Sequence, residues 1–109
     1  IEVGELTLHV LETPGHSPGS LSFYSTDVKE FNGQSVDGVV FTGDLIFRRS
    51  IGRSDVPGGN QGTLFSSIKN KIMQNPDLDG HFILLPGHMG ITSIEEEKRM
   101  NMFKRHFLD

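Results

Sequence analysis

The stretch Thr13–Ser20 constrains the fold of this chain more than any other. It reads TPGHSPGS, with two prolines and two glycines placed around one histidine, His16. It follows the alternating run Leu6–Leu11, a pattern that predicts a β-strand. Because proline fixes φ and glycine permits positive φ, the segment predicts a loop of defined shape. Such a loop gives His16 a fixed direction, which strand pairing alone does not require of a histidine.

Two later stretches repeat this construction of an apolar run, a glycine and a polar residue. Val39-Val40-Phe41 leads to Thr42-Gly43-Asp44, and Phe82–Leu85 leads to Pro86-Gly87-His88. Strand ends are rigid places from which to hold ligands, and imidazole and carboxylate suit zinc, iron or manganese. The three strand ends therefore predict a shared metal site built from His16, Asp44 and His88.

The composition excludes several classes of protein. The chain has 109 residues, no Cys, no Trp and a formal net charge of −4, which is one domain's worth at most. Without Cys there are no disulfides or thiolate metal sites, and a cytoplasmic location is expected. No apolar run approaches the ~20 residues of a membrane span, and the acidic balance argues against nucleic-acid binding. The chain opens on Ile1 rather than Met, and we expect it to be a piece of a longer protein.

The first part of the chain predicts three neighbouring strands of one sheet, within residues 5–43. Residues 5–12 alternate, with Leu6, Leu8 and Val10 on one face and His9 on the other as a surface residue. Leu21–Ser25 is a second β-rich run. A polar segment with the turn signal Asn32-Gly33 then leads to the third strand.

The rest of the chain predicts a helix, a strand and a second helix. Gln61–Asn75 carries an apolar stripe at helical spacing, and Asn75-Pro76 ends it. His81 opens the last strand as an edge residue, and Met89–Thr92 is expected to be a short loop. Ser93 with Glu96 fits a capping box for the second helix, in which His106 is a partner of the helix dipole. The residues expected to pack this helix are Ile94, Met100, Met102, Phe103 and Phe107.

The segment between Asp44 and the first helix is long for a compact domain, which favours a role at the site. Arg48, Arg49 and Arg53 could meet an anionic substrate there. An alternative is that Arg53 and Asp55 pair with each other or cap the helix that follows.

Taken in order, these motifs resemble a known family. TPGHSPGS, VVFTGDLIF, GRSDVPGG, LLPGHMGIT and EEEKRMN are similar to the C-terminal half of the metallo-β-lactamase superfamily, and most similar to its glyoxalase II-type hydrolases (hydroxyacylglutathione hydrolases). The resemblance covers nearly the whole chain. It implies an α+β fold, namely the C-terminal half of an αββα sandwich with a mixed sheet and two main helices.

The resemblance also implies a metal centre and a reaction. Two divalent metal ions, usually zinc and otherwise iron or manganese, would be held by His16 on the first metal, Asp44 bridging both, and His88 on the second. Paired metals lower the pKa of a shared water to near neutrality. The metal-bound hydroxide, oriented by Asp44, would cleave a thioester such as S-lactoylglutathione.

One departure from the family pattern matters most. The family's His-x-His-x-Asp-His motif, which supplies further ligands to each metal, is not in this chain. We therefore expect the chain alone to be inactive. We expect the N-terminal half of the domain, with this motif, to lie upstream of Ile1. The sheet face that this half would cover should be exposed and should bind either the missing half or a second copy of the chain. Residues expected on that face are Leu6, Leu8, Phe23, and Val40 or Phe41.

Other functions remain open on the same scaffold. Persulfide dioxygenases share the pattern of Gly52-Arg53-Ser54-Asp55 but use a single iron. A lactonase or another ester hydrolase would use the same metal ligands. A non-catalytic binding module would be favoured if the upstream segment lacked the histidine-rich motif.

Overall fold

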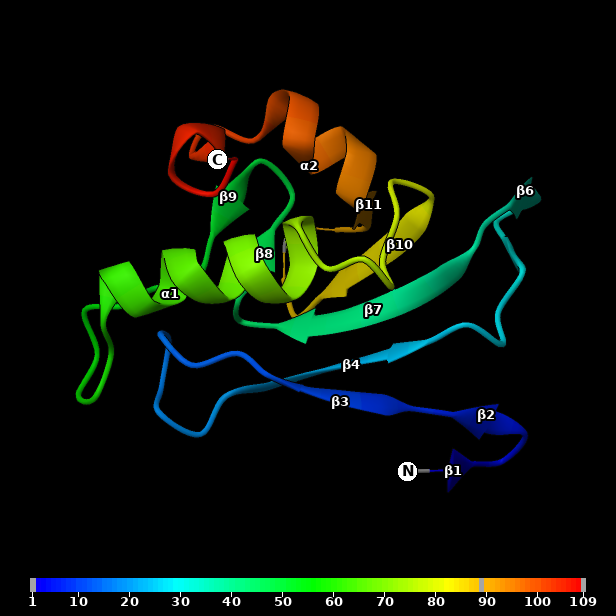
Figure 1. Ribbon diagram of the computed structural model, residues 1–109, viewed down its shortest axis with the longest axis horizontal. Coiled ribbons are helices and arrows are strands. Elements are labelled where there is room, and N and C mark those ends of the chain that lie inside the picture. The colour runs from blue at the N-terminus through cyan, green and yellow to red at the C-terminus, as the bar shows by residue number, and fades with distance from the viewer. Residues whose placement is uncertain (1, 89, 109) are drawn as a thin grey trace.

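The computed structural model describes residues 2–88 and 90–108. Its main feature is a five-stranded sheet in the order β11-β10-β7-β4-β3 (Figure 1), in which β7 and β10 are parallel and the other neighbours antiparallel. The strands of this sheet are β3 (His9–Glu12), β4 (Leu21–Ser25), β7 (Gly38–Gly43), β10 (Phe82–Pro86) and β11 (Thr92–Ser93). The mixed sheet confirms the predicted α+β class.

Three two-stranded hairpins surround this sheet. They are β1 (Glu2–Val3) with β2 (Leu6–Thr7), β5 (Glu30–Phe31) with β6 (Gln34–Ser35), and β8 (Ile46–Phe47) with β9 (Ser50–Ile51). The helical segments are α1 (Gln61–Ser67), the π-helical continuation η1 (Ile68–Met73), α2 (Ile94–Met100) and the 3₁₀ turn η2 (Lys104–His106). Within the described residues, no helix combines the length and apolar character needed to cross a bilayer.

The meander of β3, β4 and β7 confirms the three predicted neighbouring strands. The first of them is shorter than expected, because residues 5–12 divide between β2 and β3. Gly4, at φ 60°, lets β2 fold back on β1, and the backbone N–H of Thr7 donates to the Asp27 carboxylate at 2.8 Å. Those bonds draw β2 out of the sheet. His9 is exposed and stacks on Tyr24 from the neighbouring strand, with ring centroids 4.7 Å apart.

The first helix forms where the sequence predicts it. Asn60 caps it by accepting a hydrogen bond from the Thr63 N–H at 2.8 Å. Its apolar stripe of Leu64, Ile68 and Ile72 is fully buried against the core face of the sheet. The final turn is π-helical and ends at Met73, two residues before the predicted end.

The second helix is capped as predicted but ends early. The Ser93 side chain accepts from the Glu96 N–H at 3.1 Å. Asn101 has an extended backbone at ψ 135°, so the helical face does not continue, and Met100 and Met102 are 49% and 72% exposed rather than packed. The predicted packing role is wrong for both methionines, for Met102 because it lies beyond the end of the helix, whereas Ile94 and Phe107 are fully buried as expected. Thr92–Ser93 is a strand rather than a loop, and Met89 lies outside the described residues.

Among the described residues, the core lies on one face of the sheet. Figure 1 shows α1 and α2 beside β7 and β10, and Val40, Leu84 and Phe82 point into the apolar cluster with them. On the opposite face, the register aligns Val10, Phe23 and Phe41 across three strands. Val10 and Phe41 are 46% and 38% exposed. We call Val10, Phe23 and Phe41 the open face.

The open face agrees in part with the sequence prediction. Phe23 and Phe41 lie on it, and Val40 points the other way because side chains alternate along a strand. Leu6 belongs to the β1–β2 hairpin and Leu8 to its junction with β3. The prediction that Leu6 and Leu8 lie on this face of the sheet is wrong, because the predicted strand of residues 5–12 divides into β2 and β3.

Candidate metal centre

The three predicted ligands meet at one edge of the sheet. Asp44 directly follows β7, and His88 follows β10 by two residues. Because β7 and β10 are parallel, their carboxyl ends share an edge. β4 runs antiparallel to β7, so the β3–β4 loop that carries His16 lies at the same edge.

The Asp44 carboxylate is the centre of this group. Its Oδ2 atom lies 3.6 Å from the Nε2 atom of His16, and its Oδ1 atom lies 3.6 Å from the Nε2 atom of His88. Each oxygen thus faces a different histidine. The arrangement matches what a bridging carboxylate requires, since it holds one partner on each side.

The distances suit metal ligation better than direct hydrogen bonding. A separation of 3.6 Å is too long for a hydrogen bond. Two ligand atoms bound at about 2.1 Å to one tetrahedral metal lie about 3.4 Å apart. The His16–Asp44 and His88–Asp44 pairs are both close to that spacing. The donor set and its geometry therefore fit a pair of divalent ions.

A backbone contact fixes the ring of His16. Its Nδ1 atom lies 2.8 Å from the carbonyl oxygen of Arg53. A carbonyl can only accept, so Nδ1 carries a proton, and in the neutral ring Nε2 then keeps its lone pair. The lone pair is then directed toward Asp44, as in metal-binding histidines whose second nitrogen is held by a carbonyl.

The loop that carries His16 is tied to α1. The Ser67 hydroxyl donates to the Pro14 carbonyl at 2.6 Å, and the Asn60 N–H donates to the Gly15 carbonyl at 2.7 Å. The base of the loop is closed by the Thr13 N–H, which donates to the Ser20 carbonyl at 3.0 Å. These hydrogen bonds explain how a short segment rich in proline and glycine holds His16 in one orientation.

Glycines permit the close approach of the other two strand ends. The Gly87 N–H donates to the Gly43 carbonyl at 2.8 Å, which joins the ends of β10 and β7. A Cβ atom at Gly87 would lie 3.3 Å from the Asp44 Oδ1 atom. The absence of a side chain at Gly87 therefore leaves room beside the carboxylate.

The sequence of this chain matches a known protein family. Residues 1–88 match the sequence profile of the metallo-β-lactamase superfamily. The chain belongs to the metallo-β-lactamase superfamily. His16, Asp44 and His88 all lie within the matched residues.

Curated relatives in the superfamily share more than a third of the aligned residues. The chain is 38% identical over 107 residues to the probable metallo-hydrolase YqgX of Bacillus subtilis, covering 98% of this chain and 45% of the relative. It is 36% identical over 103 residues to the hydroxyacylglutathione hydrolase GloC of Haemophilus influenzae, covering 94% and 43%. The chain therefore spans about half the length of the curated relatives that it matches.

Solved superfamily structures agree with the fold. The BLEG-1 B3 metallo-β-lactamase gives a TM-score of 0.80 at 38% identity, covering 95% of this chain and 44% of that one. ETHE1 from Myxococcus xanthus gives 0.77 at 32%, covering 99% and 46%. TTHA1623, solved in a di-iron-bound form, gives 0.70 at 38%, covering 88% and 42%. These matches confirm the predicted fold class.

The structure gives the three candidate substrate arginines partners within the chain. Arg53 pairs with Asp55 at 2.9 Å, which confirms the alternative weighed from the sequence, and this hydrogen bond lowers the pKa of the Asp55 carboxyl. The Arg48 Nε atom lies 3.7 Å from Glu96. The Arg49 guanidinium contacts Glu96 at 2.6 Å and Glu97 at 2.9 Å. Their substrate role stays a prediction, and Arg49 already has anionic partners on α2.

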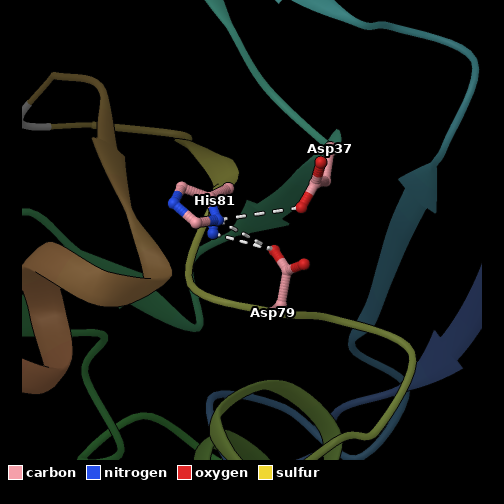
Figure 2. A group of neighbouring side chains, drawn as sticks. All are labelled: Asp37, Asp79 and His81. Carbon is pink, nitrogen blue, oxygen red and sulfur yellow. Dashed lines mark hydrogen bonds and ion pairs between the residues drawn. The ribbon is translucent and has the colours of Figure 1, made fainter.

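A second group of possible ligands lies at the other end of β7. Figure 2 shows His81 directed toward Asp37 and Asp79, with its Nδ1 atom 3.8 Å and 3.9 Å from their carboxylates. At about 3.3 Å per residue, the length of β7 separates this group from Asp44 by about 20 Å. The Asp37 N–H donates to the His81 carbonyl and the His81 N–H to Asp79. These bonds join the start of β7 to the loop before β10.

The carboxyl groups of this second cluster influence each other. A hydrogen bond with Asp79, together with partial burial, raises the pKa of Asp37, and the same bond lowers the pKa of Asp79. Sequence reasoning missed the cluster because Asp37 is more than 40 residues from Asp79 and His81 in the chain. All three side chains are at least half exposed, and their backbone bonds account for the arrangement as a junction between segments.

Proposed function

We propose that this chain belongs to a metal-dependent hydrolase of the glyoxalase II type, which cleaves a thioester such as S-lactoylglutathione. The observation that carries the proposal is the Asp44 carboxylate with one histidine on each oxygen, at 3.6 Å in both cases. Similarity to the hydroxyacylglutathione hydrolase GloC supports the substrate class. The absence of a G-x-S-x-G motif and of Cys agrees with a reaction that needs no side-chain nucleophile.

The proposed cofactor is a pair of divalent metal ions. His16 would hold one ion, His88 the other, and Asp44 would bridge them. When bound, such a pair activates a water molecule and polarises the carbonyl that it attacks. Zinc is our first choice because imidazole and carboxylate suit it. Iron and manganese accept the same donors, and the related TTHA1623 has been solved with two irons.

The residues of this chain prepare the site in distinct ways. The Arg53 carbonyl fixes the tautomer of His16, so that Nε2 is available without rearrangement. The Phe47 ring packs against His88 with centroids 5.7 Å apart and limits how far that exposed ring can turn. Asp44 is 45% exposed, which leaves its carboxylate accessible to a ligand. Each of these effects reduces the cost of binding.

The remaining ligands are proposed to come from an upstream segment of the same protein, and the chain alone is proposed to be inactive. The same segment is our proposed occupant of the open face. Val10, Phe23 and Phe41 form an aligned apolar surface there, and the relatives are about twice as long as this chain. A second copy of the chain is the competing occupant. A cytoplasmic location also forms part of the proposal.

A second function is supported by one specific pattern. Gly52-Arg53-Ser54-Asp55 fits the sequence shared by persulfide dioxygenases, which use a single iron, and ETHE1 of Myxococcus xanthus is similar in fold and sequence. A lactonase or other ester hydrolase, or a non-catalytic binding module, would use the same scaffold. The number and identity of the bound metals distinguish the oxidative chemistry from the hydrolytic one.

The deciding experiment measures metal content and activity together. The 109-residue chain and the full-length protein that contains it are purified, analysed for metals and assayed for S-lactoylglutathione hydrolysis. We expect about two metals per protein and thioester cleavage for the full-length form, and neither for the chain alone. A single iron without thioesterase activity would favour persulfide oxidation. A full-length protein that binds no metal would exclude the site at His16, Asp44 and His88.

A further inference from the structure

The β8–β9 hairpin is linked to all three candidate metal ligands, by a direct contact to His88 and through the adjacent chain to Asp44 and His16. Asp44 lies two residues before β8, and the Arg53 carbonyl that orients His16 lies two residues after β9. Phe47, on the hairpin itself, packs against the His88 ring. The base of the hairpin is closed by the Gly52 N–H, which donates to the Leu45 carbonyl at 3.0 Å. The position of one short hairpin therefore affects the whole site.

Two strands of two residues each do not hold a hairpin in place by themselves. The turn between them contains Arg49 at φ 67°, a backbone conformation that is costly for a residue with a side chain. The surrounding structure must supply the energy that keeps this turn. Burial of Leu45 and Ile46 in the core anchors the strands of the hairpin, and a partner on α2 holds the turn itself.

Glu97 holds the turn through both of its carboxylate oxygens. Its Oε1 atom accepts from the Arg49 backbone N–H at 2.7 Å, and its Oε2 atom accepts from the Arg49 guanidinium at 2.9 Å. The Thr92 hydroxyl also donates to Oε2. Glu97 is fully buried, so its oxygens depend on these donors for their hydrogen bonds.

Asn101 connects the same carboxylate to the hairpin backbone. Its Nδ2 atom donates to Glu97 at 2.8 Å and to the Ser50 carbonyl at 3.0 Å. This side chain is 2% exposed. Asn101 is the C-cap of α2, and its backbone N–H donates to the Glu97 carbonyl, which keeps the two residues side by side. Together they attach α2 to the hairpin across about 50 residues of sequence.

We propose that Glu97 is a positioning residue for the metal centre, acting through the hairpin that presents Asp44, the Arg53 carbonyl and Phe47. The part of the inference that concerns metal binding rests on the proposed function. The part that concerns the orientation of His16 does not. Loss of the Glu97 carboxylate releases the strained turn at Arg49. The hairpin then shifts, and the Arg53 carbonyl moves away from the His16 ring.

The test compares Glu97→Gln with Glu95→Gln in the full-length protein. Both changes remove one negative charge from α2, but Glu95 is exposed. Zn²⁺ affinity is measured by competition with a chromophoric chelator. We expect Glu97→Gln to bind Zn²⁺ about 10- to 100-fold more weakly, as is typical when an outer partner of a metal ligand is lost. Glu95→Gln should match the wild type.

A second measurement does not depend on metal. In the metal-free protein, the His16 Nδ1–H that donates to Arg53 should give a slowly exchanging proton resonance in NMR spectra. We expect Glu97→Gln to lose this resonance and Glu95→Gln to keep it. If Glu97→Gln retains both the resonance and wild-type affinity, the inference is wrong. If the wild type binds none of Zn²⁺, Fe²⁺ and Mn²⁺, the proposed function fails, and the His16 resonance still decides the role of Glu97.

A milder pair of variants covers the case in which Glu97→Gln does not fold. Thr92→Val removes the hydroxyl that donates to Glu97 at nearly constant volume, and Thr92→Ser keeps a hydroxyl. We expect Thr92→Val to weaken Zn²⁺ binding by about 5-fold, the value of one hydrogen bond, and to broaden the His16 resonance. Thr92→Ser should restore both. Equal behaviour of the two variants would overturn the proposal.

Discussion

Gly15 lies directly against the backbone of Leu64. A Cβ atom at Gly15 would fall 2.3 Å from the Leu64 Cα atom, and Gly15 has φ 137°. The residue beside His16 thus touches the first turns of α1 without any intervening side chain. This contact brings the His16 loop against α1.

Gly15→Ala should therefore disrupt the loop. The added methyl group must displace helix backbone, and the positive φ is unfavourable for alanine, so we expect a loss of about 2–4 kcal/mol in the free energy of unfolding. Chemical denaturation of the full-length protein measures it. Gly19→Ala is the matched control in the same loop, because a Cβ there meets nothing within 4 Å. Equal stability of the two variants would show that the contact does not constrain the loop.

The contribution of Glu96 to the stability of the protein should depend on pH. Its hydrogen bond with Arg49 lowers the pKa of the Glu96 carboxyl below its ordinary value. A lowered pKa gives stability that is present above the unfolded pKa of about 4.3 and is lost as the pH falls through the folded pKa. Glu96→Gln should thus cost about 1 kcal/mol at pH 7 and little below the folded pKa. Thermal unfolding from pH 7 to pH 2.5 tests this, and a difference that does not vary with pH would contradict it.

Phe41 should be buried in the full-length protein if an upstream segment covers the open face. Phe41→Glu would then place a charge in an apolar contact, and we expect a loss of at least 2 kcal/mol in stability. Met102→Glu, at a 72% exposed methionine away from that face, should change stability by less than about 0.5 kcal/mol. Sedimentation analysis separates the two proposed occupants. Dissociation of a dimer by Phe41→Glu would identify a second copy, and an unaffected stability would show that the face stays open.

Asp37→Asn should stabilise the protein at neutral pH. The pKa of Asp37 is raised by the hydrogen bond with Asp79 and by partial burial, while His81 and Lys29 nearby act in the opposite direction. A raised carboxyl pKa means that ionisation destabilises the fold above that pKa, and the cost is absent below the unfolded pKa of about 3.9. The melting temperature of Asp37→Asn should exceed that of the wild type at pH 7 and equal it near pH 3.

The matched control for this change is Asp77→Asn, at an exposed aspartate of the adjacent loop. It removes the same charge without separating two carboxylates that share a hydrogen bond. A melting temperature that rises equally in both variants would point to net charge rather than to the Asp37–Asp79 pair. A fall in Asp37→Asn alone would show that the carboxylate is needed for the junction with His81.

The sequence predicted that His16, Asp44 and His88 lie close together, and both histidines are 3.6 Å from Asp44 in the structure. This prediction was possible because each residue follows a strand and a glycine, and that signal is local. Their role as metal ligands stays a prediction. The pairing of Arg49 with Glu97 was missed because its members are 48 residues apart, and no local pattern links them. From sequence alone, a charged residue is expected to face solvent or to bind substrate, so its pairing with a distant residue is not predicted.

The ends of the elements were predicted less well for a similar reason. In the sequence, the helical spacing of apolar residues continues past Asn101 and predicts that Met102 packs in the core. In the structure, the Asn101 side chain bonds the hairpin at Ser50, and the helix stops there. Likewise, Thr92–Ser93 is too short to show alternation, and it forms a strand only because β10 is beside it. Long-range partners decide such boundaries.

The mixture of antiparallel and parallel pairing in the sheet has a consequence for folding kinetics. The strands that bring His16 near Asp44 form a meander of successive neighbours, whereas His88 arrives by the parallel pairing of β7 with β10 across α1. Contacts distant in sequence form later because a longer loop must close first. We therefore expect the His16–Asp44 side of the site to form before the His88 side. A nascent chain would then present half of a metal centre before the other half exists.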